Sequence, residues 1–374
     1  MIRIVADDKI PFLRGALEQF AEIIFLPGNK ITNNDLKDAD ALLTRTRTTC
    51  NESLLKGTRI RFIGSATIGY DHIDTVYCKK NKIYWTNAPG CNSASVLQYI
   101  ASALFKVAHE QGFNLKSKTI GIVGVGNVGS KVHKLAARIG MKVMVNDPPR
   151  ARNEDGGNFV VLEKILNESD FITIHVPLNF SGEDKTYHFF SSGVFEMMRT
   201  GTWLFNSSRG EVIDTNELKE AIASGKLGGA VLDVWENEPH IDPDLLEKAF
   251  IATPHIAGYS ADGKANGTSM IVNSLCRFFK LPLQNWYPQN VPLPLSPDIF
   301  IDCKGKSEED ILREAVFHTY DITGDDMNLR SSPSDFERLR GDYPLRREYP
   351  SYRVNLMNSN KNVQNILKDL GFKV

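Results

Sequence analysis

Hydrophobic positions in the first part of this chain form short runs separated by amphipathic stretches. Five of these runs predict β-strands between residues 2 and 89: IRIVAD, AEIIFLP, DALLTRT, RFIGSAT and IYWTNAP. Near-continuous apolar runs are typical of parallel strands that are buried on both faces. Because helix-like segments alternate with them, the pattern predicts right-handed βαβ crossovers in a doubly wound α/β sheet.

A second and stronger series of strand-like runs begins at residue 118. It comprises KTIGIVGVGNVGS, KVMVND, DFITIHVP, TWLFNSSRG, GGAVLDVW and FIATPH. Each run ends in polar residues or glycine. Ligands of open α/β sheets bind at the carboxyl ends of the strands, so we expect the chemistry of this chain at these ends.

Two long helical patterns flank the second series. Residues 93–111 have apolar positions at helical spacing and end at Gly112, which predicts a helix that passes between two domains. Residues 261–280 predict a second helix that returns the chain to the first domain. The segment 286–297, WYPQNVPLPLSP, contains four prolines and predicts an extended linker, which a tail with further helical patterns follows.

Composition narrows the class of protein. Hydrophobic residues make up 42% and charged residues 24% of the chain, as in ordinary globular proteins. With 44 Lys and Arg against 45 Asp and Glu, the net charge of −1 gives no general attraction to nucleic acid or to an anionic membrane. The five scattered cysteines, and the lack of a signal peptide or a long apolar run in the sequence, predict reduced thiols, no metal site and a cytoplasmic location.

A glycine-rich turn predicts a dinucleotide site. Gly124, Gly126 and Gly129 form G-x-G-x-x-G between an apolar strand and a helical pattern, where a helix N-terminus attracts a pyrophosphate. The next strand ends at Asp147, a position suited to a ribose diol. The negative charge of this carboxylate would repel the ribose phosphate of NADP, so it favours NAD. Arg150 and Arg152 follow closely and would reduce that repulsion.

Three further strand ends carry charged residues in a characteristic order. Arg209 stands in NSSRGEVIDTNEL, Asp233 and Glu238 in DVWENEP, and His255 in TPHIAG. A single histidine is more commonly structural than catalytic, but the ordered set together with the glycine turn resembles the D-2-hydroxyacid dehydrogenase family over about residues 1–285. The resemblance implies a discontinuous substrate domain around an inserted NAD domain.

The resemblance also implies roles for these residues. Arg209 would bind the substrate carboxylate and polarise the reacting oxygen, His255 would act as general acid and base, and Glu238 would orient the imidazole and stabilise its protonated form. The implied cofactor-binding residues are Gly124, Gly126, Asn127, Val128, Gly129, Asp147, Ser207, Asp233 and Gly258.

Additional segments resemble one subgroup of the family. They are VADDKIPF, LLTRTRTTCNESLL, GSATIGYDHID, NAPGCNSASV, NDPPRA, TPHIAGYS and, in the tail, YDITGDDMNLR and RREY. This resemblance implies NAD-dependent oxidation of 4-phospho-D-erythronate in vitamin B6 synthesis, substrate contacts by Thr46, Thr67, Arg209 and Tyr259, and a homodimer formed through the tail. Candidate donors to the substrate phosphate are Arg45, Arg47, Arg346 and Arg347.

We therefore expect two doubly wound domains and a small α+β C-terminal domain. The substrate domain would comprise residues 1–95 and 257–285, the NAD domain residues 96–256, and the linker and dimerisation domain residues 286–374. Two alternatives remain: another D-2-hydroxyacid dehydrogenase, of phosphoglycerate or lactate type, or an NAD-sensing binding protein similar to corepressors of this fold. A formate dehydrogenase is disfavoured, because an amide would then replace Glu238.

Overall fold

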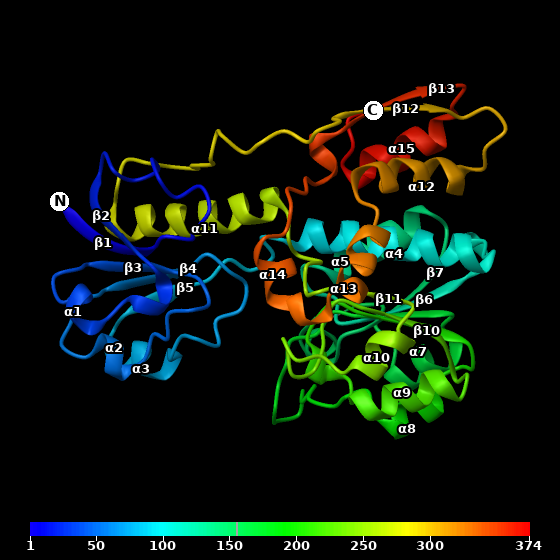
Figure 1. Cartoon of the computed structure of the whole chain (residues 1–374), viewed down its shortest axis with the longest axis horizontal. Coiled ribbons are helices and arrows are strands. Elements are labelled where there is room, and N and C mark those ends of the chain that lie inside the picture. The colour runs from blue at the N-terminus through cyan, green and yellow to red at the C-terminus, as the bar shows by residue number, and fades with distance from the viewer. Residues whose placement is uncertain (155) are drawn as a thin grey trace. The chain divides into compact units, whose positions relative to one another are not determined.

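The computed structural model describes residues 1–154 and 156–374 and divides the chain into two compact units (Figure 1). The first unit comprises Met1–Asn92 and Ser260–Pro292, and the second comprises Ser93–Tyr259 and Leu293–Val374. The C-terminal segment clusters with the second unit, and its separate role in dimerisation stays a prediction. No helix among the described residues is both long and apolar enough to cross a membrane.

The first unit is built on a parallel sheet of order β2-β1-β3-β4-β5, one of the common doubly wound orders. Its strands are β1 (Ile2–Asp7), β2 (Ala21–Leu26), β3 (Ala41–Thr44), β4 (Phe62–Ser65) and β5 (Tyr84–Thr86). Alternate side chains of the strands enter two apolar layers, one with α11 and one with the short helices α1 to α3 (Figure 1). These helices are α1 (Asn33–Leu36), α2 (Glu52–Leu55), α3 (Thr75–Lys80) and α11 (Ala261–Phe279).

The second unit contains a parallel sheet of order β11-β10-β9-β8-β6-β7. Its strands are β6 (Thr119–Val123), β7 (Lys142–Asn146), β8 (Phe171–Ile174), β9 (Thr202–Asn206), β10 (Leu227–Leu232) and β11 (Ile251–Ala252). An isolated parallel bridge between Val145 and Phe159 continues the order beyond β7. With this bridge counted as the third strand position, the order is 3-2-1-4-5-6-7, which is the 3-2-1-4-5-6 order of dinucleotide-binding folds with β11 added at the edge.

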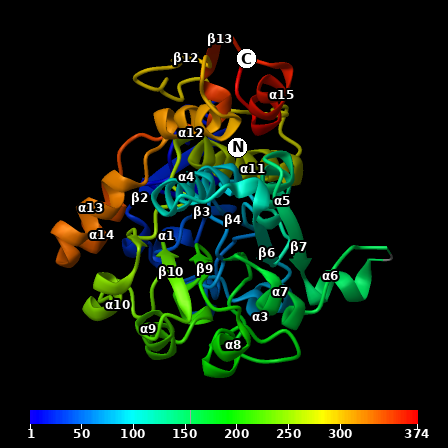
Figure 2. The same ribbon diagram turned by 90° about the vertical axis from the view of Figure 1, so that its right-hand side faces the viewer.

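Helices cover both faces of the second sheet (Figure 2). On one face, α4 and α5 lie in an apolar layer that also contains residues of the C-terminal segment, and on the other face α7 to α10 form a second layer. The helices are α4 (Ser93–Gln111), α5 (Gly129–Arg138), α6 (Pro148–Asn153), α7 (Leu162–Glu168), α8 (Ser192–Met197), α9 (Thr215–Ala223) and α10 (Pro243–Lys248). As expected, α4 ends before Gly112, whose φ of +66° suits a residue without a Cβ.

The C-terminal segment is a small α+β arrangement, and the predicted fold class is confirmed. It contains two parallel strands, β12 (Asp298–Asp302) and β13 (Arg353–Met357), and the helices α12 (Glu308–Thr319), α13 (Thr323–Ser331), α14 (Phe336–Gly341) and α15 (Lys361–Leu370). The helix α12 packs against α4, so this segment shares an apolar core with the second sheet. That shared core explains why the two cluster as one unit. Short 3₁₀ turns lie at Gly28–Lys30, Leu115–Ser117, Gly210–Val212, Pro333–Asp335 and Tyr349–Ser351.

Candidate active site

The carboxyl ends of three neighbouring strands in the second sheet carry the predicted catalytic residues. Arg209 follows β9, Glu238 lies in the loop after β10, and His255 follows β11. All strands of this sheet are parallel, so the glycine turn that follows β6 lies at the same edge. The topology therefore collects the candidate chemistry of the second unit at one edge of the sheet.

His255 and Glu238 form a hydrogen-bonded pair. Nδ1 of His255 lies 2.8 Å from Oε2 of Glu238, and the other carboxylate oxygen accepts the backbone N–H of Trp235 at 3.0 Å. Because an ionised carboxylate only accepts hydrogen bonds, Nδ1 carries a proton in this arrangement. The opposite ring atom, Nε2, is then the one that can exchange a proton with a ligand.

The environment of Glu238 keeps its carboxylate ionised. Burial on its own would raise the pKa of Glu238, but the hydrogen bond and charge of His255 act against it, together with the Trp235 N–H and the Arg340 guanidinium. The net effect places the pKa of Glu238 below its ordinary value. The pair thus consists of an acceptor with a stable charge and an imidazole that it orients.

A tight turn presents His255 to the strand edge. The φ of His255 is +56°, a left-handed conformation that is uncommon for residues other than glycine. Its N–H donates to the carbonyl of Asp233 at 2.7 Å, and the N–H groups of Ile256 and Ala257 donate to the carboxylate of Asp233 at 2.7 and 2.9 Å. These bonds hold the turn in a conformation that it would otherwise rarely adopt.

The carboxyl group of Asp233 is almost completely buried, with 1% of the residue exposed. Burial raises its pKa above the ordinary value, although the charge of His255 and the hydrogen bonds of Ala257, Thr253 and Ile256 oppose this rise. Both oxygens accept bonds from the chain itself. The structure therefore gives Asp233 a role in shaping the turn, and its contact with a cofactor stays a prediction.

Arg209 lies in the loop after β9, partly exposed, with an Nη1 that donates to the carbonyl of Ser208 at 2.8 Å. Asn206 donates from Nδ2 to the carbonyl of Arg209 at 2.9 Å and fixes this backbone. An added Cβ on Gly210 would collide with the backbone of Trp235, so the loop of Arg209 packs directly on the loop that carries Glu238. Nearby, Oγ of Ser207 is buried without a partner among the described residues.

The glycine turn fits the backbone of a dinucleotide cradle. Gly124 has a φ of +88°, and a Cβ there or on Gly129 would collide with a backbone carbonyl, at His175 and Gly124 respectively. A Cβ on Gly126 would meet no atom within 4 Å. Two of the glycines are therefore required by packing, while Gly126 leaves open space on the side from which a pyrophosphate approaches. Asn127 is exposed in the same turn, and Val128 immediately precedes α5.

Asp147 lies at the end of β7, where the sequence predicted a ribose ligand. Its carboxylate accepts the N–H of Val125 at 2.8 Å and that of Arg150 at 3.1 Å, which connects it to the glycine turn and caps α6. The two arginines that follow are paired with other carboxylates: Arg150 with Glu154, and Arg152 with Glu183 and Asp184. Little positive charge is thus available to bind the 2′-phosphate of NADP, which favours NAD.

The predicted substrate residues of the first unit lie in loops at the carboxyl ends of β3 and β4. Thr46 is exposed in the loop after β3. Oγ1 of Thr67 lies 2.8 Å from Oγ of Ser65 and donates to the carbonyl of Gly69 at 3.0 Å. Ser65 also lies 3.2 Å from Nε2 of His72, so a short hydrogen-bonded chain fixes the hydroxyl of Thr67.

Tyr259 and Gly258 follow His255 in the same turn, and both are partly buried. The ring of Tyr259 meets that of Tyr343 edge to face, with 6.0 Å between the centroids, and the guanidinium of Arg340 lies 5.9 Å from its centre. Nη1 of Arg340 is also 3.6 Å from Oε2 of Glu238. Sequence reasoning missed Arg340, because half of the six residues of α14 are charged, as on an ordinary solvated surface.

Arg346, one of the candidate phosphate ligands, is 5% exposed and contacts the turn that carries His255. Its Nη2 donates to the carbonyls of Ile256 and Ala257 at 3.0 and 2.6 Å and to Oγ of Ser95 at 2.6 Å. Its guanidinium lies over the ring of Tyr320, 4.3 Å from the centroid. Nε and Nη1 of Arg346 are buried without a hydrogen-bond partner among the described residues, and its contact with the substrate phosphate stays a prediction.

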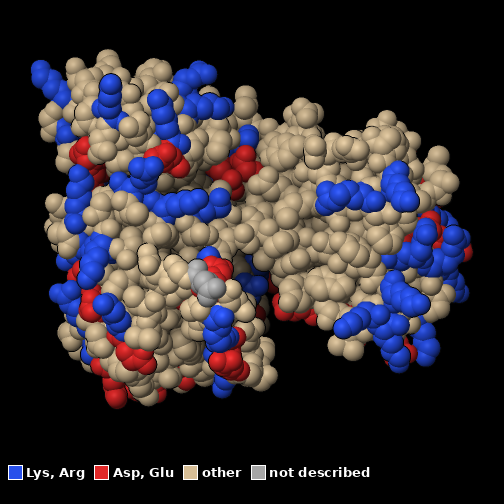
Figure 3. Space-filling view, turned by 180° about the vertical axis from the view of Figure 1, so that it is seen from behind, with Lys and Arg blue, Asp and Glu red and all other residues tan. Residues whose placement is uncertain are grey.

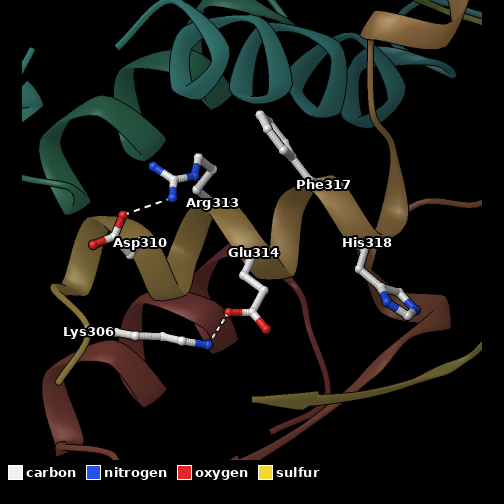
Figure 4. A pocket seen from close by; sticks show the side chains of 6 residues that line it. All are labelled: Lys306, Asp310, Arg313, Glu314, Phe317 and His318. Carbon is white, nitrogen blue, oxygen red and sulfur yellow. Dashed lines mark hydrogen bonds and ion pairs between the residues drawn. The ribbon is translucent and has the colours of Figure 1, made fainter. Parts of the chain in front are cut away.

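A large hollow of about 630 Å³ lies on the C-terminal segment along α12 (Figure 4). Its charged side chains are paired with each other, Arg313 with Asp310 at 2.9 Å and Lys306 with Glu314, so they leave little charge for a ligand. Within residues 1–154 and 156–374, no cluster of three or more His, Cys, Asp or Glu side chains has the arrangement of a metal site.

Family comparisons agree with this geometry. Residues 96–257 match the family described as D-isomer specific 2-hydroxyacid dehydrogenase, NAD binding domain. Residues 293–371 match a second family, which is described only as a domain of unknown function. The first match covers the sheet of the second unit with its glycine turn, Glu238 and His255, and confirms NAD as the cofactor.

Full-length relatives narrow the family further. The chain is 51% identical over 354 residues to an erythronate-4-phosphate dehydrogenase of Bacteroides fragilis, a match that covers 94% of this chain and 99% of the relative. It is 39% identical over 374 residues to the erythronate-4-phosphate dehydrogenase of Proteus mirabilis, with 99% of both chains covered. This chain belongs to the erythronate-4-phosphate dehydrogenase family. It is thus an NAD-dependent oxidoreductase of the D-2-hydroxyacid dehydrogenase type.

Solved structures share most of this fold. A D-lactate dehydrogenase of Aquifex aeolicus, in complex with NAD and lactic acid, is 27% identical with a TM-score of 0.60, and the match covers 74% of this chain and 95% of that one. A 3-phosphoglycerate dehydrogenase of Entamoeba histolytica, with bound NAD⁺, is 26% identical with a TM-score of 0.62. This match covers 77% of this chain and 98% of the neighbour's chain. About a quarter of this chain therefore lies outside its match with each of these two neighbours.

Proposed function

We propose that this chain oxidises 4-phospho-D-erythronate at its 2-hydroxyl group to (R)-3-hydroxy-2-oxo-4-phosphooxybutanoate, in the biosynthesis of pyridoxal 5′-phosphate. The observation that carries this proposal is the Glu238–His255 pair, at 2.8 Å, on the same sheet edge as the glycine turn in a member of the erythronate-4-phosphate dehydrogenase family. NAD, when bound, supplies the acceptor for the hydride that leaves carbon 2.

The residues of the chain bind the acid and move the proton. Arg209 forms paired hydrogen bonds to the substrate carboxylate and polarises the reacting oxygen, a task that suits a planar guanidinium. Nε2 of His255 removes the proton of the 2-hydroxyl group, and Glu238 stabilises the resulting positive ring. In the reverse direction the same nitrogen returns the proton to the oxygen.

The remaining ligand contacts follow the placement of the predicted residues. Thr46, Thr67 and Tyr259 bind the substrate. Asp147 holds the adenosine ribose, and the glycine turn holds the pyrophosphate. The other cofactor contacts are made by Asn127, Val128, Ser207, Asp233 and Gly258. We propose the same division of roles as in the sequence analysis: residues 1–95 and 257–285 bind substrate, residues 96–256 bind NAD, and residues 286–374 mediate dimerisation.

We further propose that the protein is a cytoplasmic homodimer that binds neither membrane nor nucleic acid. The five cysteines are free and buried, which is typical of a reducing compartment. The net charge is −1, and Figure 3 shows Lys and Arg side chains interspersed with Asp and Glu on the face that it presents. Such a mixture does not produce the basic stripe that favours nucleic acid. A single sedimentation peak at the mass of one chain would contradict the dimer.

The function is tested by measuring NADH formation with 4-phospho-D-erythronate beside D-lactate, 3-phosphoglycerate and unphosphorylated erythronate. We expect turnover with 4-phospho-D-erythronate to exceed that with each of the others. Preference for another acid would show a different D-2-hydroxyacid dehydrogenase. NAD binding without turnover of any of the four acids would favour an NAD-sensing protein.

A further inference from the structure

The helix α14 of the C-terminal segment brings a cation to the catalytic pair. Nη1 of Arg340 lies 3.6 Å from Oε2 of Glu238, which is the same oxygen that contacts Nδ1 of His255 at 2.8 Å. The Glu238 carboxylate therefore has two cationic neighbours when the imidazole is protonated, and one when it is neutral. The side chain of Glu238 is only 19% exposed, so solvent screens these interactions incompletely.

The position of Arg340 is set by its helix. Phe336 is buried and Leu339 partly buried in the apolar layer that contains α7 to α10, and together they anchor α14. Nε of Arg340 is buried without a hydrogen-bond partner among the described residues, and the guanidinium lies 5.9 Å from the ring centre of Tyr259. The guanidinium thus lies beside both the Glu238 carboxylate and the Tyr259 ring, and of these two neighbours the carboxylate is the charged one.

The charges around the pair come from four elements. Asp233 lies at the end of β10, Glu238 in the loop that follows it, Arg340 on α14, and Arg346 in the segment before β13, where its charge acts on Asp233. Tyr259, from the turn before α11, is the other titratable side chain that lies close. Arg340 is the cation in contact with Glu238, so its removal changes the balance of the pair most directly.

We propose that Arg340 is a positioning residue that keeps Glu238 ionised and aligned, and that sets the pH at which His255 changes its charge. A cation beside the shared carboxylate opposes protonation of the imidazole, whereas Glu238 favours it. The C-terminal segment thereby contributes to the proton transfer itself, in addition to any role in assembly. This inference rests on the proposed function, since it assigns a purpose to the same pair.

A matched set of variants separates this role from a structural one. Arg340→Gln removes the charge but keeps most of the side-chain length, and Arg340→Lys keeps the charge. Arg338→Gln, on the same helix, is the control, because Arg338 is 60% exposed and pairs with Asp335 away from the catalytic residues. None of these changes alters Phe336 or Leu339, so α14 keeps its apolar anchors.

The decisive measurement is the pH dependence of kcat/KM for NADH formation. One limb of this pH profile reports the protonation of His255. We expect that limb to move to higher pH in Arg340→Gln by about half to one unit, because loss of the cation favours the protonated ring. The limb should stay within about 0.2 units of wild type in Arg340→Lys and Arg338→Gln. An unmoved limb in Arg340→Gln, or an equal shift in Arg338→Gln, would overturn the proposal.

A spectroscopic titration keeps this test independent of the substrate assignment. The ring Cε1–H signal of His255 can be identified among those of the eight histidines by its loss in His255→Asn. In the protein without ligands, the midpoint of the change of this signal with pH should move to higher pH in Arg340→Gln. This expectation holds whichever acid the enzyme oxidises. If wild type turns over none of the four acids, the proposed function fails, while this titration still decides the role of Arg340.

Discussion

Nδ1 of His255 lies 2.8 Å from Oε2 of Glu238, although the two residues follow different strands, β11 and β10. The contact fixes the ring by Nδ1, and Nε2 is the nitrogen that we propose to exchange a proton with the substrate. The turn that carries His255 is held by the buried carboxylate of Asp233, which accepts the N–H groups of Ile256 and Ala257. The residue His255 is therefore restrained at both its ring and its backbone.

Replacement of His255 by asparagine tests the proton-transfer step. We expect His255→Asn to lower kcat by about 10² or more, because general acid and base catalysis typically contributes 10² to 10⁴. The affinity for NAD should be retained, since the glycine turn and Asp147 are unchanged. Steady-state assays and a titration of the variant with NADH, followed by fluorescence, measure both quantities. Near-normal turnover would remove His255 from the mechanism.

Glu238→Gln tests the coupling within the pair. The amide keeps the shape of the side chain but carries no charge, so it no longer favours the protonated imidazole. We expect the limb of the kcat/KM profile assigned to His255 to move to lower pH, by about one unit. This shift is opposite in sign to that expected for Arg340→Gln. A limb that stays in place would show that the carboxylate does not influence the proton transfer.

Two glycines of the cofactor turn offer a matched pair of variants. A Cβ on Gly129 would collide with the carbonyl of Gly124, whereas a Cβ on Gly126 would meet no atom within 4 Å. We expect Gly129→Ala to lower the free energy of unfolding by about 1–3 kcal/mol or more, as overpacking does. Gly126→Ala should change it by less than about 0.5 kcal/mol and yet weaken NAD binding, because the methyl group occupies the space of the pyrophosphate.

The two measurements for this pair are thermal unfolding without cofactor and calorimetric titration with NAD. A drop in affinity of about tenfold or more in Gly126→Ala, with an unchanged melting temperature, is the expected result. Unchanged affinity in this variant would contradict the assignment of the turn as the pyrophosphate site. The comparison with Gly129→Ala separates loss of binding from loss of folding.

Most of the fold follows from the spacing of apolar residues. Buried parallel strands such as β6 and β9 are continuous apolar runs, and long helices such as α4 have a clear apolar period, so both types were predicted. An α+β C-terminal domain was expected, but the positions of β12 and β13 were not predicted, because a two-stranded sheet buries one face only. Phe300 on β12 is 73% exposed. The alternation of buried and exposed side chains in β12 extends over only five residues, after a proline-rich segment.

The predicted catalytic side chains share a sheet edge because parallel topology brings strand ends together, and this rule can be applied to a sequence. The contributions of Arg340 and Arg346 could not be anticipated in this way. Both lie in a charged stretch with the composition of a solvated surface, and their roles depend on tertiary packing of α14 and of the segment before β13. Local spacing carries no information about such contacts.

His175 offers a test of stability against pH. It follows β8, with Nε2 2.9 Å from Oγ1 of Thr173, and burial lowers its pKa to about 3. In the unfolded chain a histidine titrates near pH 6.5. Between about pH 6.5 and 3 the unfolded state therefore binds more protons than the folded state, so this residue lowers stability progressively as the pH falls through that window.

We expect the melting temperature of wild type to decrease between about pH 7 and pH 5, and the decrease to be smaller in His175→Gln. The difference should correspond to about 2 kcal/mol at about pH 5, since the residue stays neutral in the fold while its unfolded form is charged. His133→Gln is the control, because His133 is exposed on α5 and should leave the pH dependence unchanged. Equal pH dependence in wild type and His175→Gln would show that His175 accepts a proton in the folded state without cost.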